Sequence, residues 1–207
     1  MSPRFLALLH AEGLAPRRVL DVGSGWGRLA LALAPHARHV VGIDRDAGAI
    51  DEARRRAAAQ GLANAEFHVA DAEAVDYAAW MPDLVTAHLC VSDPIVERAA
   101  RALARGGGLG LVAFHVDQWR ETGRVSRFAY DEARMATALR RAGLEPEVLE
   151  VEREEQHFRS VEEALAAAVG LEERWRADGR WFRYLAYLEG GGRTLTRSHL
   201  LALARKA

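Results

Sequence analysis

Hydrophobic residues along the chain form short runs of β-type pattern, separated by longer stretches with helical spacing. The short runs are typical of buried β-strands and cover residues 18–22, 39–43, 65–69, 84–88 and 109–115. The stretches with helical spacing lie between them, at residues 26–34, 47–60 and 93–104. Strands that alternate with helices are typical of a parallel sheet with helices on both faces, so we predict a three-layer, doubly wound α/β fold.

The rest of the chain predicts the end of the same sheet. A helical pattern and two strand patterns follow, at residues 130–142, 147–157 and 196–205. A long helical stretch over residues 160–188 separates the last two strands. We therefore predict one domain over residues 1–207, with a mostly parallel seven-stranded sheet, an antiparallel last strand and a helical insertion at 159–192 before that strand.

The helix predicted at residues 93–104 has signals at both ends. The Asp93 side chain can cap the free N–H groups of a first turn, where the missing N–H of Pro94 costs nothing. Three glycines at 106–108 follow, and glycine commonly ends a helix. We therefore expect Asp93 to be the cap of this helix.

The composition indicates a globular protein with balanced charge. Half of the 207 residues are hydrophobic, and 18 Gly and 6 Pro are too few for a low-complexity or collagen-like chain. The 28 basic and 29 acidic side chains give a net charge of −1, which provides no strong electrostatic surface for nucleic acid. Nucleic acid is therefore disfavoured as a partner.

The single cysteine and the short apolar runs bear on the compartment. Cys90 has no partner for an internal disulfide, and one thiol cannot build a Cys-based zinc cage, so we expect no metal. No apolar run reaches the roughly 20 residues needed to span a bilayer, and the N-terminal run ends without a secretory cleavage pattern. We expect a cytoplasmic protein that does not contact a membrane, and the sequence leaves its oligomeric state open.

A glycine-rich loop follows the first predicted strand. Gly23, Gly25 and Gly27 stand where an open α/β sheet binds ligands, and without a Cβ they let a ligand approach the backbone closely. The dinucleotide-binding fingerprint Gly-x-Gly-x-x-Gly would place its third glycine at position 28, where this chain has Arg28. A pyrophosphate ligand is therefore disfavoured, and a nicotinamide-dependent oxidoreductase is kept only as an alternative.

Two aspartates end the second and third predicted strands. Asp44 lies 21 residues after Gly23, and a carboxylate there can accept hydrogen bonds from both hydroxyls of a ribose. Asp44 or Asp71 alone would also fit a helix cap, since each precedes a helical pattern. Together with the glycine loop, they indicate that the sheet binds a ligand that contains a ribose.

Four motifs stand at the ends of predicted strands or in the turn before one. They are Asp-Val-Gly-Ser-Gly-Trp-Gly at 21–27, Val-Gly-Ile-Asp at 41–44, Ala-Asp-Ala-Glu at 70–73 and Leu-Ala-Arg-Gly-Gly-Gly-Leu at 103–109. In these motifs the chain resembles the class I S-adenosylmethionine-dependent methyltransferases. The resemblance covers residues 17–155 and a last strand at 198–206, and it is weakest in the insertion.

The resemblance implies that the cofactor is S-adenosylmethionine. Its binding residues would be Asp21, Gly23, Ser24, Gly25, Gly27, Asp44, Asp71, Ala72 and His88. Asp71 would accept a hydrogen bond from the exocyclic amine of adenine, and the Ala72 N–H would donate to the ring. The cofactor's carboxylate would favour N–H groups of the glycine loop, whereas its ammonium and sulfonium would favour carbonyls and Asp21.

Two histidines are the candidate catalytic residues. Methyl transfer requires alignment of two reactants and exclusion of water, and an acceptor that carries a proton can also need a general base. His88 and His115 end the fourth and fifth strands, which are neighbours in the family's sheet. The alternative is structural: His88 would pack against the methionine part of the cofactor, and His115 would be partly exposed on a loop.

The insertion and the missing motifs bear on the acceptor. Five aromatic side chains and four arginines between residues 174 and 187 fit a packed helix, a lid over an acceptor pocket or an RNA-binding surface. Nearby acidic residues nearly cancel the charge of the arginines, so RNA binding ranks last.

Cys90 is interpreted as a small buried residue. It lacks the Pro-Cys or equivalent context of the catalytic cysteine in methyltransferases that act on C5 of cytosine. We predict a small-molecule acceptor, with an RNA (tRNA or rRNA) methyltransferase and a non-catalytic binding module as alternatives.

Overall fold

The computed structural model describes residues 1–207 and divides the chain into two compact units. Unit 1 comprises Met1–Ala113, Glu132–Glu150 and Leu201–Ala207, and unit 2 comprises Phe114–Asp131 and Val151–Leu200. The long strands β7 (Leu144–His157) and β8 (Thr194–Lys206) each contribute residues to both units. The interpretation of residues 1–207 as one domain stays a prediction.

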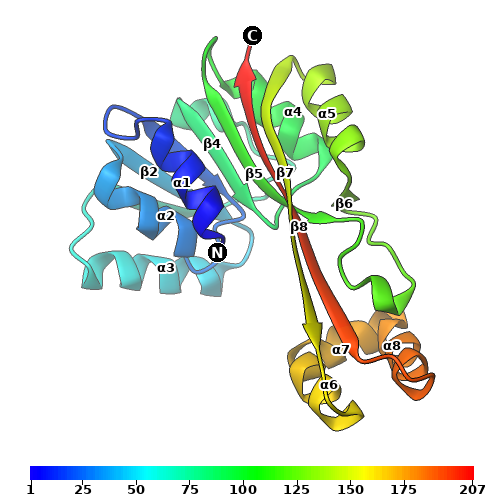
Figure 1. Ribbon diagram of the computed structural model, residues 1–207. Helices are drawn as coiled ribbons and strands as arrows, with labels where there is room; N and C mark the ends of the chain where they lie inside the picture. The colour runs from blue at the N-terminus through cyan, green and yellow to red at the C-terminus, as the bar shows by residue number, and fades with distance from the viewer. The chain divides into compact units, whose positions relative to one another are not determined.

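Figure 1 shows the elements of the chain. The other strands are β1 (Arg18–Val22), β2 (His39–Asp44), β3 (Ala65–Val69), β4 (Leu84–His88), β5 (Gly108–His115) and β6 (Ala129–Tyr130). The α-helices are α1 (Pro3–Ala11), α2 (Arg28–Leu33), α3 (Ala47–Ala59), α4 (Asp93–Ala102), α5 (Glu132–Arg141), α6 (Val161–Ala168), α7 (Glu172–Asp178) and α8 (Arg180–Glu189). The first five predicted strands are thus confirmed to within one residue. None of the helices is long and apolar enough to cross a membrane.

The strands form a single sheet in the order β3-β2-β1-β4-β5-β8-β7, and the short strand β6 pairs with the end of β5. Neighbours from β3 through β5 are parallel. The last strand is antiparallel to β5, because the N–H of Lys206 near its end donates to the carbonyl of Gly107 just before β5. The predicted fold class is confirmed, and β6 raises the number of strands from seven to eight.

Helices cover both faces of the sheet in unit 1. On one face, α1, α2 and α3 share an apolar core with the strands, in which Phe5, Leu29 and Ile50 are buried. On the other face, α4 and α5 contact each other and bury Ile95 and Met135. Because both faces are covered, the central strands are mostly apolar. Thr86 in the middle of β4 is a buried polar exception, and its hydroxyl is hydrogen-bonded to Asp21.

Helix α1 is an element that the sequence pattern does not predict. Ser2 caps it by accepting a hydrogen bond from the Phe5 N–H at 3.1 Å, and Pro3 occupies its first position. An ideal Cβ on Gly110 of β5 would lie 2.6 Å from Leu9 Cδ2. Glycine at this position therefore allows α1 to lie directly against the sheet.

The start of α4 differs from the prediction. Ser92, not Asp93, precedes the first turn, and the Ser92 hydroxyl donates to Glu73 Oε1 at 2.6 Å instead of accepting from the helix. Asp93 lies inside the first turn, where its negative charge is favourable at a helix N-terminus. The expectation that Asp93 is the cap is therefore wrong, and the helix ends at Ala102 because Leu103 is extended.

The insertion in unit 2 consists of three short α-helices instead of one long helix. Helices α7 and α8 meet at Gly179, whose φ of +82° ends the first of them. The three helices and the loop after β5 share an apolar cluster that includes Trp119, Trp175, Trp181, Tyr184 and Leu188. The side chains of Trp181, Tyr184 and Leu188 on α8 thus pack inside unit 2, which fits the alternative of a packed helix. A role of residues 159–192 as a lid stays a prediction.

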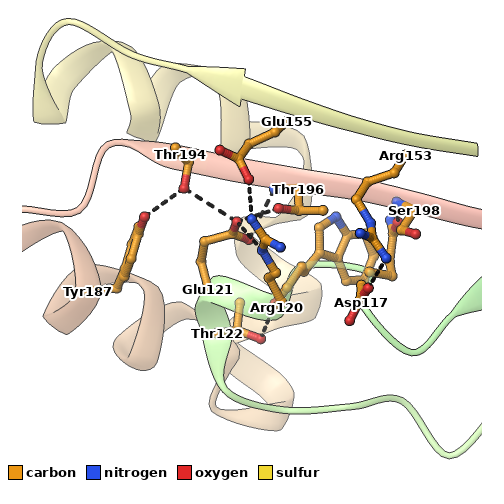
Figure 2. Close-up of polar contacts among 12 residues, drawn as sticks. Asp117, Arg120, Glu121, Thr122, Arg153, Glu155, Tyr187, Thr194, Thr196 and Ser198 are labelled. Atoms are coloured by element: carbon orange, nitrogen blue, oxygen red, sulfur yellow. Dashed lines mark hydrogen bonds and ion pairs between the residues drawn. The ribbon is translucent and has the colours of Figure 1, made fainter.

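A buried carboxylate joins the loop after β5 to the first residues of β8 (Figure 2). The Glu121 side chain is 3% exposed and accepts hydrogen bonds from the Thr196 N–H at 3.0 Å and the Thr196 hydroxyl at 2.5 Å. The Thr194 hydroxyl lies 3.4 Å from Glu121 Oε1 and 2.6 Å from the Tyr187 hydroxyl. Glu121 therefore holds the start of β8 through both backbone and side-chain groups.

Replacing Glu121 with alanine is expected to lower the free energy of unfolding by about 2–4 kcal/mol, because the N–H and hydroxyl of Thr196 lose their buried acceptor. Glu121→Gln keeps an acceptor oxygen on a side chain of the same length and is expected to cost about 1 kcal/mol. Urea unfolding of both variants measures the difference. Equal destabilisation by the two substitutions would contradict the role assigned to this carboxylate.

Candidate functional site

The glycine loop connects β1 to α2 through backbone that ordinary residues avoid. Gly23, Gly25 and Gly27 have φ values of +68°, +52° and +76°. An ideal Cβ on Gly23 would lie 2.4 Å from the Cβ and Sγ of Cys90, whereas one on Gly25 would meet nothing within 4 Å. The loop is thus packed against the turn after β4 at its start and open on the side of Gly25.

A cavity of about 260 Å³ lies beside this loop in unit 1. It is lined by Met1, Asp21, Gly23, Ser24, Trp26, Arg28, Leu29, Arg56 and His88. Four of the residues predicted as cofactor ligands, namely Asp21, Gly23, Ser24 and His88, are therefore brought together at one cavity. Its size is that of a site for a small ligand or part of one.

Asp21 is the buried acidic group of this cavity. Its side chain accepts hydrogen bonds from the Thr86 hydroxyl at 3.0 Å and from the Ala30 N–H at 3.2 Å. Burial raises the pKa of Asp21 from its ordinary 3.8 to about 7, and the two hydrogen bonds oppose that shift only in part. A carboxyl with this pKa gains its negative charge near neutral pH. Once ionised, the Asp21 carboxylate favours a cationic ligand.

Asp44 ends β2 directly beside the glycine loop. Its Oδ2 accepts from the Gly25 N–H at 2.9 Å, and its Oδ1 accepts from the Asp46 N–H at 3.0 Å. A carboxylate has about four lone-pair positions, so two remain for hydroxyl donors. The backbone therefore orients Asp44 without using its full capacity, as the predicted ribose contact requires.

Asp71 and Ala72 follow β3 and keep groups available for a ligand. Asp71 is exposed, and its Oδ1 accepts from the Glu73 N–H at 2.9 Å. The carbonyl of Ala72 accepts from the Tyr77 hydroxyl at 2.6 Å, whereas its N–H donates to no protein group. One carboxylate oxygen and one N–H are thus free to meet the amine and ring of an adenine.

The Ser24 hydroxyl gives a further indication that the residues present fit S-adenosylmethionine. This hydroxyl is buried at the cavity and has no hydrogen-bond partner in the protein. A buried polar atom without a partner costs about 1–3 kcal/mol, which a ligand atom at that position would recover. The loop N–H groups fit the expectation less well, because those of Ser24, Gly25 and Gly27 already donate to protein acceptors.

His88 lies in the wall of the cavity at the end of β4. The next residue, Leu89, has a φ of +60°, and its N–H donates to the Val112 carbonyl at 2.7 Å. A left-handed conformation at a residue other than glycine is strained and is held here by the paired backbone. The chain therefore turns sharply after His88 and brings Cys90 against Gly23.

His115 ends β5 and belongs to unit 2. It is buried, contrary to the expectation of a partly exposed loop residue, because Ser198 of β8 and the following turn enclose it. Its Nδ1 accepts from the Asp117 N–H at 3.2 Å and lies 3.0 Å from the Ser198 hydroxyl. Since an N–H can only donate, the neutral ring carries its proton on Nε2. His115 is not in the wall of the cavity described above.

Cys90 behaves as a packing residue, as the sequence indicates. Burial raises the pKa of its thiol to about 11, so the thiolate form is scarce at neutral pH. The residue is only partly buried, which differs from the expectation of a small buried residue. Its contact with Gly23 explains why both residues are small.

Several residues of the cavity are not found by the sequence motifs. Trp26 stands at one of the two positions of the Gly-x-Gly-x-Gly loop that the motif leaves open. Arg56 lies near the end of α3. Met1 is placed there by α1, which the hydrophobic pattern does not predict. Of these cavity residues, only Arg28 stands out in the sequence, because it replaces the third glycine of the dinucleotide-binding fingerprint.

Comparison with known proteins gives three findings. Residues 19–107 match the family model described as a methyltransferase domain. The 23S rRNA (uracil(1939)-C(5))-methyltransferase RlmD of Xanthomonas euvesicatoria is 44% identical over 71 residues, which are 34% of this chain and 16% of that protein. The chain thus spans less than a fifth of the length of this curated relative.

The solved structures that resemble the chain cover nearly all of it. The YcgJ protein of Bacillus subtilis aligns with a TM-score of 0.75 at 17% identity over 99% of both chains. A SAM-dependent methyltransferase of Methanosarcina mazei aligns with a TM-score of 0.65 at 19% identity over 100% of this chain and 98% of that one. These likenesses show the fold. The match of residues 19–107 to a methyltransferase domain agrees with the family that the sequence motifs indicate.

Proposed function

We propose that the protein transfers the methyl group of S-adenosylmethionine to a small molecule. The proposal rests above all on the cavity of about 260 Å³ in which the buried Asp21 carboxyl and the Ser24 hydroxyl face a glycine-lined backbone. The net charge of −1 supports a small acceptor over a polyanion. A cytoplasmic location is part of the proposal and rests on the single cysteine, Cys90, which has no partner for an internal disulfide.

In this proposal the cofactor supplies a methyl group on a positively charged sulfur. Asp44 binds the ribose hydroxyls, and Asp71 with the Ala72 N–H binds the adenine. Asp21 binds the ammonium group in its ionised form. These residues fix the position of the reacting carbon, and Met1 and Leu29 give the cavity wall an apolar part.

His88 is our candidate for the group that receives the acceptor's proton. It lies at the cavity wall, and a neutral imidazole has a ring nitrogen that can accept a proton. The proposal gives His115 a lesser part, because its ring is buried and its Nδ1 already accepts a hydrogen bond. With its proton on Nε2, the His115 ring donates a hydrogen bond through Nε2 and accepts a proton only at Nδ1, after the bond from the Asp117 N–H is broken.

RNA methylation is the second candidate function, favoured by the names of the curated relatives. Those names belong to proteins of which this chain matches 16% of the length, so the shared part need not include their acceptor site. Local clusters of arginine in unit 2 are offset by acidic residues such as Glu172 and Asp178, which pair with Arg176 and Arg180.

The two candidates are separated by incubating the protein with methyl-labelled S-adenosylmethionine and either a small-molecule extract or total RNA. We expect label in the small-molecule fraction and none in RNA. His88→Ala is expected to reduce the label by about 100-fold if this group acts as a base, while S-adenosylhomocysteine still binds. His115→Ala is expected to act mainly through stability. Label that enters RNA alone would support the second candidate instead.

A further inference from the structure

The wall of the cavity carries more positive than negative charge. Arg28 and Arg56 are both in it, and Asp21 is its one acidic side chain. Arg56 forms an ion pair with Glu52, in which Arg56 Nε lies 2.7 Å from Glu52 Oε1. Arg28 is exposed and forms no ion pair or hydrogen bond with any protein side chain. One guanidinium at the cavity is therefore available for an anionic ligand.

Trp26 is the second unusual feature of this wall. The indole is 61% exposed although it stands on a short loop beside a buried core, so packing does not account for it. The guanidinium carbon of Arg56 lies 5.6 Å from the centre of its ring, within the range of a cation–π contact. Trp26 thus holds a second positive charge at the same wall as Arg28.

Part of the loop's backbone is already used within the protein. The N–H groups of Ser24, Gly25 and Gly27 donate to the Ile43 carbonyl, the Asp44 carboxylate and the Ser24 carbonyl. These three groups do not serve an anion at the loop, so a side-chain donor would add to the N–H groups that remain at the start of α2. A guanidinium provides two parallel N–H groups that match a carboxylate, and such charge-assisted bonds are stronger than neutral ones.

We propose that Arg28 binds a carboxylate in this cavity, with Arg56 on Trp26 as a supporting charge. The carboxylate has two sources within the proposed function, on which this inference rests. It is either the amino-acid end of the cofactor, next to the ammonium bound by Asp21, or a carboxylate of the acceptor. Both sources place an acid group within reach of one unpaired guanidinium.

Calorimetry on the full chain tests the subsite with three probes. S-adenosylhomocysteine carries the amino-acid carboxylate, 5′-methylthioadenosine lacks it, and benzoate represents an acceptor acid that fits beside an indole. Each is titrated into wild-type protein, Arg28→Gln and the control Arg38→Gln, an exposed arginine outside the cavity wall. Benzoate is titrated both into free protein and into protein saturated with S-adenosylhomocysteine. Thermal midpoints confirm that both variants are folded.

If the cofactor supplies the carboxylate, Arg28→Gln weakens S-adenosylhomocysteine about tenfold or more and leaves 5′-methylthioadenosine unchanged. If the acceptor supplies it, Arg28→Gln leaves both nucleosides unchanged and weakens benzoate by a similar factor. The inference is overturned if Arg28→Gln binds all three probes as wild type does, or if Arg38→Gln has the same effect. Failure of wild-type protein to bind either nucleoside would instead count against the proposed function, and the benzoate arm would still test Arg28.

Discussion

Gly23→Ala is expected to lower the free energy of unfolding by about 2–4 kcal/mol. The added Cβ would lie 2.4 Å from both Cβ and Sγ of Cys90, a contact that forces the turn after β4 to move. Overpacking of this kind costs about 1–3 kcal/mol, and the φ of +68° adds about 1 kcal/mol for a residue with a side chain. The loop that carries Ser24 would shift with the clash.

Two controls separate the clash from the backbone strain. Gly25→Ala has a φ of +52° and no atom within 4 Å of the new Cβ, so it is expected to cost only about 1 kcal/mol. Introducing Gly23→Ala into a Cys90→Gly background removes the clash and should reduce its cost to a similar value. Urea unfolding of wild type, Gly23→Ala, Gly25→Ala, Cys90→Gly and the double variant measures these costs. A Gly23→Ala cost no larger than that of Gly25→Ala would show that the packing at Cys90 is not tight.

Asp21→Asn is expected to stabilise the protein above neutral pH by about 4 kcal/mol. Burial raises the pKa of Asp21 from 3.8 to about 7, so between these values the folded state binds a proton that the unfolded state does not. The wild-type protein therefore loses stability from this group as the pH rises from about 4 to about 7, by about 1.4 kcal/mol per pH unit. An asparagine has no such loss, since it stays neutral.

The amide fits the surroundings of the carboxyl. Its oxygen accepts from the Ala30 N–H and its NH₂ donates to the Thr86 hydroxyl, so both existing contacts have a counterpart. Unfolding free energies of wild type and Asp21→Asn are compared at pH 4 and pH 8. We expect a small difference at pH 4 and a large one at pH 8, together with weaker binding of S-adenosylmethionine by the variant. A difference that does not change with pH would show that Asp21 is already ionised in the folded protein.

The strands could be predicted closely from the sequence, and some helices could not. Runs such as residues 18–22 and 84–88 are buried on both faces, so apolar residues predominate in them and their limits are sharp. Helix α1 has nine residues and buries only one side, and its ordering depends on contacts such as that of Leu9 with Gly110. Those contacts come from a strand about a hundred residues later, which no local pattern contains.

The candidate site shows the same division. Asp21, Asp44 and Asp71 follow from their positions at strand ends, which parallel topology brings to one edge of the sheet. The burial of His115 could not be predicted from the sequence, because Ser198, which encloses it, lies 83 residues further along the chain in an antiparallel strand. Arg56 likewise reaches the cavity only through the packing of α3 against the loop, where Ala53 contacts Gly27.

The central claim is tested most directly by titrating S-adenosylhomocysteine and NAD separately into the protein in a calorimeter. The account predicts that one S-adenosylhomocysteine binds per chain, that NAD gives no heat of binding, and that Asp44→Ala weakens S-adenosylhomocysteine by tenfold or more, since hydrogen bonds to a charged group contribute about 1.5–3 kcal/mol. Binding of NAD without binding of S-adenosylhomocysteine would contradict it.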